Sequence, residues 1–195
     1  MTGRLLLLIS ALWLVAACGG DDEQAKKDAK TPAEVSKKSP RARNGNLTKE
    51  GLSVTSVDLN DDGKPDQWVY KGATPKAGRI ERDMNFDGRP DMWQYKNDKD
   101  VIVEQEIDLD KDGGVDVVLY HNDDGVLERK ALSLGFGQKF TVFKYYNLKG
   151  ELLRAEQDED GNGVIDRWDY YEDGNVNRVG WDENGDGTPD RFDTL

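Results

Sequence analysis

Oxygen-bearing side chains recur at fixed offsets in five short acidic segments. The first, residues 58–66, reads DLNDDGKPD, with Asp or Asn at positions 1, 3, 5 and 9 and glycine at position 6. Glycine permits the sharp turn that brings these side chains and the carbonyl of position 7 around one point. An all-oxygen shell suits Ca²⁺, and Mg²⁺ is the second choice because it demands tighter octahedral geometry. Zn²⁺ is disfavoured because no Cys or His lies in any of these segments.

The segments are parts of a repeat. They begin at Asp58, Asp83, Asp108, Asp158 and Asp182, at intervals of 25, 25, 50 and 24 residues. The long interval contains a degenerate unit at Ser133 that keeps the glycines and aromatics but has no acidic position. The sequence therefore predicts six units and about five Ca²⁺ ions. The predicted ligands, in loop order, are Asp58, Asn60, Asp62, Lys64 and Asp66; Asp83, Asn85, Asp87, Arg89 and Asp91; Asp108, Asp110, Asp112, Gly114 and Asp116; Asp158, Asp160, Asn162, Val164 and Asp166; and Asp182, Asn184, Asp186, Thr188 and Asp190.

The alternative interpretation is that Asp, Asn and Gly simply make good turns. It explains Asp-Gly pairs but not four oxygens at the same offsets five times. Charge supports the metal: the whole chain carries −12, and losing Arg4 with a leader peptide would make this −13. Clustered carboxylates repel one another without a cation. An acidic chain also argues against nucleic acid as a partner.

Each acidic segment resembles the first half of an EF-hand loop. The bidentate Glu of EF-hands at position 12 is missing, since that position holds Val69, Gln94, Leu119, Asp169 or Asp193. The spacing, with Asp at position 9, is similar to the calcium loops of integrin FG-GAP blades and thrombospondin type 3 repeats. The resemblance covers only the nonapeptides, and the cysteines of thrombospondin repeats are absent.

The residues between the loops predict the elements that position them. Aromatic pairs two residues apart, such as Trp68 and Tyr70, indicate a strand. A turn such as Asp124-Gly125 then leads into a second run, such as 126–132. We expect an all-β fold, an antiparallel meander of roughly a dozen strands built from ~25-residue hairpin units, with acidic loops on one edge and tight turns on the other. The pattern leaves open whether this sheet stays open or closes. The face opposite the aromatics is polar enough that we expect it to meet water.

Arginines occupy one equivalent position in the second strands: Arg79, Arg129, Arg154 and Arg178. They either lie over neighbouring aromatic rings, where each cation–π contact would contribute about 0.5 to 2 kcal/mol, or form an ordinary solvated row. The sequence favours neither interpretation.

The N-terminal segment indicates export. A basic start and a short apolar run at 5–14 end in Val15-Ala16-Ala17-Cys18, which resembles the lipobox of bacterial lipoproteins. The resemblance implies a signal peptide at 1–17 and lipidation of Cys18, with outer-membrane sorting because Asp does not follow the cysteine. Residues 18–46 have the composition of a disordered tether. Residues 47–195 form the predicted repeat domain.

Catalytic residues are not evident. The chain has one histidine, His121, and one cysteine at the cleavage site, so nucleophilic triads are implausible and we expect no enzyme activity. The leading hypothesis is a calcium-binding, lipid-anchored envelope protein with a structural or interaction role. The alternative is a calcium-stabilised module that binds a surface protein or polysaccharide through its Trp and Tyr side chains.

Overall fold

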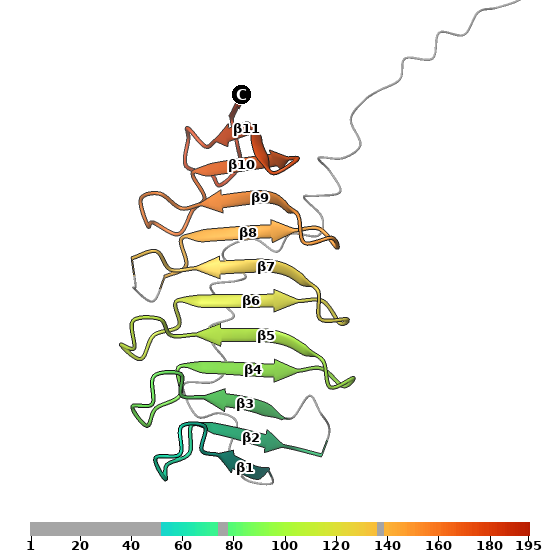
Figure 1. Cartoon of the computed structure of the whole chain (residues 1–195). Coiled ribbons are helices and arrows are strands. Elements are labelled where there is room, and N and C mark those ends of the chain that lie inside the picture. The colour runs from blue at the N-terminus through green and yellow to red at the C-terminus, as the bar shows by residue number, and fades with distance from the viewer. Residues whose placement is uncertain (1–51, 74–77, 136–138) are drawn as a thin grey trace, which may run out of the picture. The chain divides into compact units, whose positions relative to one another are not determined.

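A computed structural model of the chain describes residues 52–73, 78–135 and 139–195. The predicted signal peptide, Cys18 and the tether lie outside this part. Twelve strands form one open antiparallel sheet in strict chain order (Figure 1). Their bounds are β1 Ser53–Val57, β2 Gln67–Lys71, β3 Arg79–Arg82, β4 Met92–Lys96, β5 Ile102–Ile107, β6 Val117–His121, β7 Leu127–Leu132, β8 Val142–Tyr146, β9 Leu152–Gln157, β10 Arg167–Glu172, β11 Asn175–Trp181 and β12 Arg191–Thr194. The predicted all-β meander is confirmed, and it is open rather than closed.

The two edges of the sheet differ as expected (Figure 1). Acidic loops precede β2, β4, β6, β10 and β12 on one edge, and the degenerate loop precedes β8. On the other edge, a two-residue turn, Asp173-Gly174, joins β10 to β11 with φ of 48° and 79°. The turns of three other hairpins each contain a residue with positive φ, namely Asp100, Gly125 and Gly150. Such residues match hairpin turns to the right-handed twist of the strands.

The strand register arranges the aromatic face into two rows, an outer row in which tyrosines and arginines alternate and an inner row. Tyr70 pairs with Arg79, and Arg79 pairs in turn with Tyr95 on the next strand. The same alternation continues through Tyr120, Arg129, Tyr145, Arg154, Tyr170 and Arg178, with Glu104 in one arginine position. A second, inner row contains Trp68, Glu81, Trp93, Glu106, Val118, Ala131, Phe143, Glu156 and Trp168.

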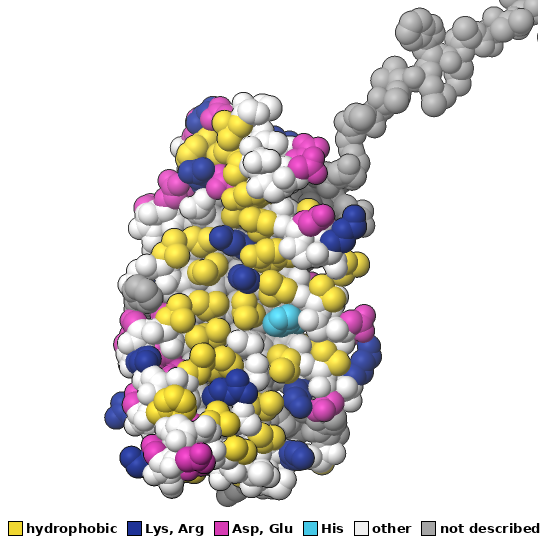
Figure 2. All heavy atoms as spheres, viewed as in Figure 1, with side chains coloured by type: hydrophobic (Ala, Val, Ile, Leu, Met, Phe, Trp, Pro, Cys, Tyr) yellow, Lys and Arg dark blue, Asp and Glu magenta, His cyan; other side chains and the backbone are white. Residues whose placement is uncertain are grey.

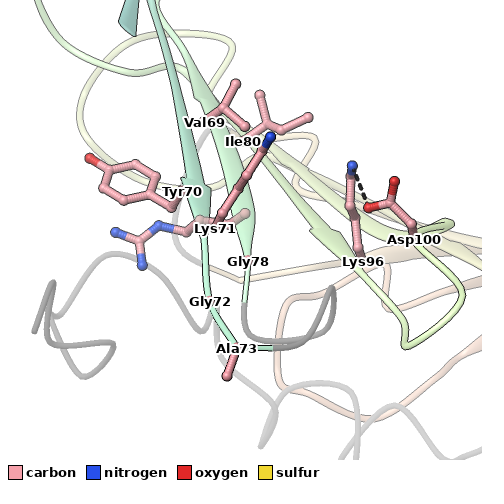
Figure 3. Close-up of a pocket in the computed structure, with 10 residues that line it drawn as sticks. Val69, Tyr70, Lys71, Gly72, Ala73, Gly78, Ile80, Lys96 and Asp100 are labelled. Atoms are coloured by element: carbon pink, nitrogen blue, oxygen red, sulfur yellow. Dashed lines mark hydrogen bonds and ion pairs between the residues drawn. The ribbon is translucent and has the colours of Figure 1, made fainter. Parts of the chain in front are cut away.

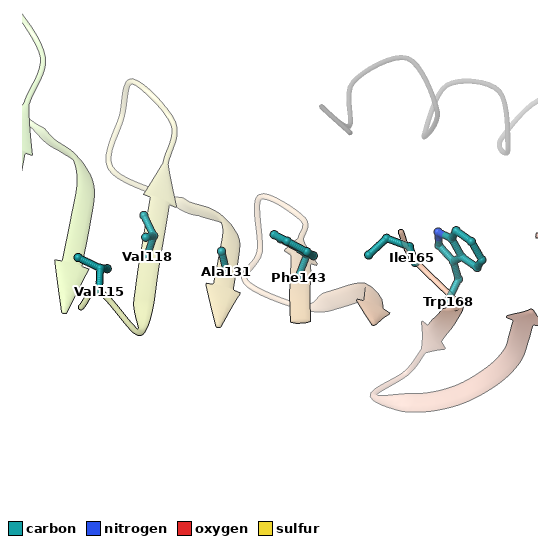
Figure 4. Packing of buried hydrophobic residues seen from close by; sticks show 6 residues of the cluster. All are labelled: Val115, Val118, Ala131, Phe143, Ile165 and Trp168. Atoms are coloured by element: carbon teal, nitrogen blue, oxygen red, sulfur yellow. The ribbon is translucent and has the colours of Figure 1, made fainter. Parts of the chain in front are cut away.

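The core is completed by the loops. Val115 and Ile165, each the eighth residue of an acidic loop, pack in one buried cluster with Val118, Phe143 and Trp168 (Figure 4). Phe140, the equivalent residue of the degenerate loop, packs against the same cluster. A single-layer sheet thus gains an interior without a second layer, and the loop conformation is tied to the packing of the sheet.

The expectation that the opposite face meets water is wrong in part. Met92, Val142 and Val179 on that face are buried, and so is the carboxylate of Asp169, which accepts hydrogen bonds from Gln157 and Arg167. Figure 2 shows one face of the sheet, where hydrophobic side chains form a band interrupted by Lys and Arg. Apolar residues therefore line both faces, because each strand contributes side chains to both.

Candidate metal centres

The first and ninth residues hold each acidic loop in shape. In the first loop Asp58 accepts hydrogen bonds from the N–H groups of Asp61 and Gly63, at 2.7 and 2.8 Å. Asp66 accepts the N–H of Leu59 at 2.8 Å. The equivalent bonds recur in the other four loops. The two aspartates of each loop therefore organise the backbone that the predicted ligand shell requires.

Positions 3 and 5 continue the same network. Asn60 accepts the N–H of Asp62, and Asp62 accepts the N–H of Lys64, the position-7 residue. The equivalent pairs of bonds occur in all five loops. Because a carboxylate has about four acceptor sites, these bonds leave lone pairs for a cation.

The backbone conformation explains position 6 and adds position 4. Glycine at position 6 has φ between 82° and 95° in all five loops. Position 4 is also left-handed in every loop, although it holds Asp61, Phe86 and Lys111 in the first three. Sequence reasoning missed this requirement because the side chains at position 4 differ so widely. A left-handed Phe is unfavourable by about 1 kcal/mol or more, so the loop network must stabilise it.

Carboxylate oxygens converge in two of the loops. Those of Asp108, Asp110 and Asp116 lie within 4.8 Å of one another, and so do those of Asp158, Asp160 and Asp166. These two groups could hold a metal ion. In the first, second and sixth units position 3 is Asn, whose Nδ2 donates to a neighbouring predicted ligand: Asn60 to Asp62, Asn85 to Asp87 and Asn184 to Asp190. In those loops an amide N–H group lies against the acidic oxygens.

Hydrogen bonds lower the pKa of three of these acids. The Asn85 amide, helped by the N–H of Arg89, lowers the pKa of Asp87 below its ordinary value of 3.8. The hydroxyl and N–H of Thr188 lower the pKa of Asp186 in the same way. Burial raises the pKa of Asp182, but N–H groups led by those of Gly187 and Gly185 outweigh it, and the net shift is downward. Hydrogen bonds that favour the charged form keep these oxygens available to a cation.

Neighbouring loops are bonded to each other through the main chain. The N–H of Asp83 donates to the carbonyl of Asp66 at 2.7 Å, which joins position 1 of one loop to position 9 of the loop before it. The same bond joins Asp108 to Asp91 and Asp182 to Asp166. The degenerate loop keeps both of its bonds, from Ser133 to Asp116 and from Asp158 to Thr141.

The arginine row lies over tyrosine rings. The guanidinium carbons of Arg79, Arg129, Arg154 and Arg178 lie 4.4, 4.0, 4.6 and 4.4 Å from the ring centres of Tyr70, Tyr120, Tyr145 and Tyr170. The cation–π interpretation is therefore confirmed over the solvated row.

Buried glutamates reinforce this row, and sequence reasoning missed them. Tyr70 and Arg79 both donate to Glu81, at 3.0 and 2.6 Å. Glu156 is contacted in the same way by Tyr145 and Arg154. The available signal was the glutamate two residues after each of these arginines.

A pocket of about 520 Å³ lies at the turn edge (Figure 3). Its lining includes Tyr70, Lys71, Arg79 and Lys96, the last of which is paired with Asp100. His121, at the end of β6, has a pKa lowered by burial.

Among the residues that the structure describes, none forms a helix with the length and apolarity that crossing a bilayer requires.

Comparison with known proteins gives little guidance. No family model matches the chain, and no curated protein matches it. Solved structures with some likeness include a GtfA/B complex bound to UDP and GlcNAc, at 15% identity and a TM-score of 0.41 over 65% of this chain. TarM aligns at 12% identity and 0.36 over 76%, and an accessory secretory protein complex of Streptococcus pneumoniae at 11% and 0.36 over 63%. This chain spans 26%, 24% and 19% of those chains, and likeness at this level carries no argument about function.

Proposed function

We propose that this protein is a calcium-binding, lipid-anchored protein of the bacterial envelope with a structural or interaction role. The observation that carries the proposal is the loop network. Five loops share the same set of hydrogen bonds, and two of them gather three carboxylates within 4.8 Å. Turn formation alone needs no such grouping of like charges, which is unfavourable without a cation.

Calcium would act on stability through the loops. Positions 1 and 9 are mostly buried and continuous with the core, whereas positions 3 and 5 are mostly exposed. An ion bound between them would join the exposed part of each loop to the sheet, so that binding free energy adds to folding free energy. Extracellular calcium modules bind at about 10⁻⁴ to 10⁻³ M, a range that fits sites facing the outside of a cell.

Calorimetric titration of the purified full chain with CaCl₂ tests the proposal. We expect about five ions to bind, and EDTA to weaken the β-type circular dichroism. Asp110→Ser with Asp112→Ser should remove one ion, because both residues are predicted ligands of one loop. Asp123→Ser with Asp124→Ser is the matched control at the turn edge and should leave the stoichiometry unchanged. Absence of calcium heat, with a spectrum indifferent to EDTA, would refute the calcium function.

The lipid anchor is tested separately. Mass spectrometry of the N-terminal peptide from cell membranes should find an acylated Cys18, and Cys18→Ser should move the protein to the soluble fraction. An unmodified cysteine in an uncleaved chain would refute the anchor without touching the calcium sites.

The alternative role, ligand binding through tryptophan rings, gains less support. Trp93 and Trp168 are only 6% exposed and belong to the interior. Four tyrosines are already covered by arginines, namely Tyr70, Tyr120, Tyr145 and Tyr170. A polysaccharide or protein partner would therefore have to bind elsewhere than on these rings.

A further inference from the structure

Exposed aliphatic side chains occupy position 2 of consecutive loops. Leu59, Met84 and Leu109 are 51%, 52% and 54% exposed, and Leu134 of the degenerate loop is 65% exposed. Single exposed leucines are common on proteins and need no explanation. Here the exposure recurs at one structural position, so the side chains form a row along the loop edge with a spacing of roughly 10 Å, two strand separations.

The last two loops differ at this position in a way that shows the row is not required by the fold. Position 2 is Glu159 in the fifth unit and Glu183 in the sixth. These glutamates pair with Arg167 and Arg191, at 3.7 and 2.8 Å. A charged side chain at position 2 is therefore compatible with the same loop conformation. The loop conformation does not explain the aliphatic residues at position 2 of the first four units.

The first three loops also carry exposed basic residues. Lys64 and Arg89 stand at position 7 and Lys111 at position 4. The equivalent positions of the last two loops hold Val164, Gly161, Thr188 and Gly185. Phe86, at position 4 of the second loop, is 48% exposed and has a φ of 64°. A bulky aromatic residue that is both left-handed and exposed is an outlier that points to a function outside the fold.

From this combination we infer that the loop edge of units one to three docks on a lipid surface with anionic head groups when calcium is bound. Aliphatic and aromatic side chains beside Lys and Arg are the composition that inserts into the interface of an anionic bilayer. The carboxylates of the same loops would repel that surface until Ca²⁺ offsets most of their charge. The inference rests on the proposed calcium binding.

Calcium and the row are connected directly. The N–H groups of Leu59, Met84 and Leu109 donate to Asp66, Asp91 and Asp116, the position-9 predicted ligands, at 2.8, 3.0 and 2.7 Å. An ion bound to the position-9 carboxylate would thereby fix the backbone that presents the position-2 side chain. The two events would appear in order, calcium first and lipid second.

Vesicle sedimentation tests the inference with the full chain carrying Cys18→Ser, which has no thiol to acylate. The vesicles are phosphatidylcholine with phosphatidylglycerol, and phosphatidylcholine alone serves as the neutral comparison. The measured quantity is the difference between calcium and EDTA, so any constant binding by residues 1–17 cancels. We expect calcium to raise binding to the anionic vesicles by about tenfold or more and to leave binding to neutral vesicles nearly unchanged.

The decisive variant is Leu59→Glu with Met84→Glu and Leu109→Glu, which copies the residue that the last two loops carry. It should reduce vesicle binding to the EDTA level while calorimetry shows unchanged calcium stoichiometry. The control is Leu148→Glu with Leu153→Glu and Leu195→Glu, at leucines that are exposed away from this row. It should bind vesicles as the parent chain does.

Each failure is distinguishable. Calcium binding without vesicle binding, or equal binding by the row variant, overturns the lipid inference and leaves the calcium proposal standing. Calcium-dependent dimers in sedimentation velocity without vesicles, abolished by the row variant, would assign the row to a second copy and overturn the lipid inference. Absence of calcium heat refutes both.

Discussion

The carboxylate of Asp116 accepts the N–H of Leu109 at 2.7 Å, seven residues back along the same loop. Asp116 is almost fully buried, and it also accepts the N–H of Asp110. Asp190, its equivalent in the last loop, accepts the corresponding bonds while exposed to solvent. Because Asp116 and Asp190 accept the same hydrogen bonds but differ in burial, substituting each one separates the effect of burial on stability from that of the hydrogen bonds.

We expect Asp116→Ala to lower the free energy of unfolding by about 2 kcal/mol in EDTA, because the N–H groups of Leu109 and Asp110 lose an acceptor in a part-buried setting. Asp190→Ala should lower it by clearly less, since water can replace the lost acceptor. Urea unfolding followed by circular dichroism measures both. Equal losses for the two variants would show that burial of the ninth residue has no energetic role.

The left-handed backbone at position 4 predicts a substitution that stabilises the protein. Lys111→Gly should raise the free energy of unfolding by about 0.5 to 1 kcal/mol, because glycine adopts a φ of 66° without the penalty of a side chain. Gly185→Ala is the reverse experiment and should lower it by a similar amount. An added Cβ at Gly185 meets no atom within 4 Å, so this loss would come from the backbone alone. Destabilisation by Lys111→Gly in chemical denaturation would contradict the argument.

Arg79, which is buried, and Arg129, which is half-buried, should differ in their contributions to stability. Arg79→Gln leaves Glu81 buried without its 2.6 Å ion pair, and we expect a loss of about 3 kcal/mol. Arg129→Gln removes a stacking contact on Tyr120 and should cost about 1 kcal/mol. Thermal and urea unfolding of the two variants side by side measure the difference. A larger loss for Arg129→Gln would argue against the role of Glu81.

Alkaline pH should weaken the aromatic face. Burial raises the pKa of Tyr120 to about 12, and burial together with Glu156 raises that of Tyr145 as well. A tyrosine whose folded pKa exceeds the unfolded value of 10.0 contributes stability that is fully present below pH 10 and is lost as pH rises toward the folded pKa. Unfolding free energies should therefore be constant from pH 8 to 9.5 and fall above pH 10.

Tyr145→Phe provides the control for this pH dependence. The variant should be less stable at pH 8, because Glu156 loses the hydroxyl that donates to it, yet its decline above pH 10 should be shallower. A parent chain whose stability stays level up to pH 11.5 would refute the assignment to these tyrosines.

Much of the fold follows from the sequence because its signals are local. Aromatic pairs such as Trp68 and Tyr70 and turns such as Asp173-Gly174 determine the strand, its face and the hairpin. In two of the five loops, three of the predicted ligands also have carboxylate oxygens within 4.8 Å of one another, as in Asp108, Asp110 and Asp116.

The features that the sequence did not reveal depend on neighbours across the sheet. Glu81 and Glu156 have the charge of surface residues, and only the register places them beside Tyr and Arg partners. Burial of Val115 and Ile165 requires the loop to fold over the inner row, which no periodicity reports. Position 4 conceals its backbone requirement because Phe86 and Lys111 are poor matches to a left-handed conformation.

The degenerate fourth unit, which has lost its acidic residues but retains its main-chain bonds to both neighbours, bears on how such an array can change in length. Each strand pairs only with the strands before and after it in the chain, so interactions do not extend past adjoining hairpins. Duplicating or deleting one hairpin would create or remove a single junction and leave every other junction intact. Gene duplication in steps of one unit would thus lengthen or shorten the protein while the chemistry of individual loops drifted independently.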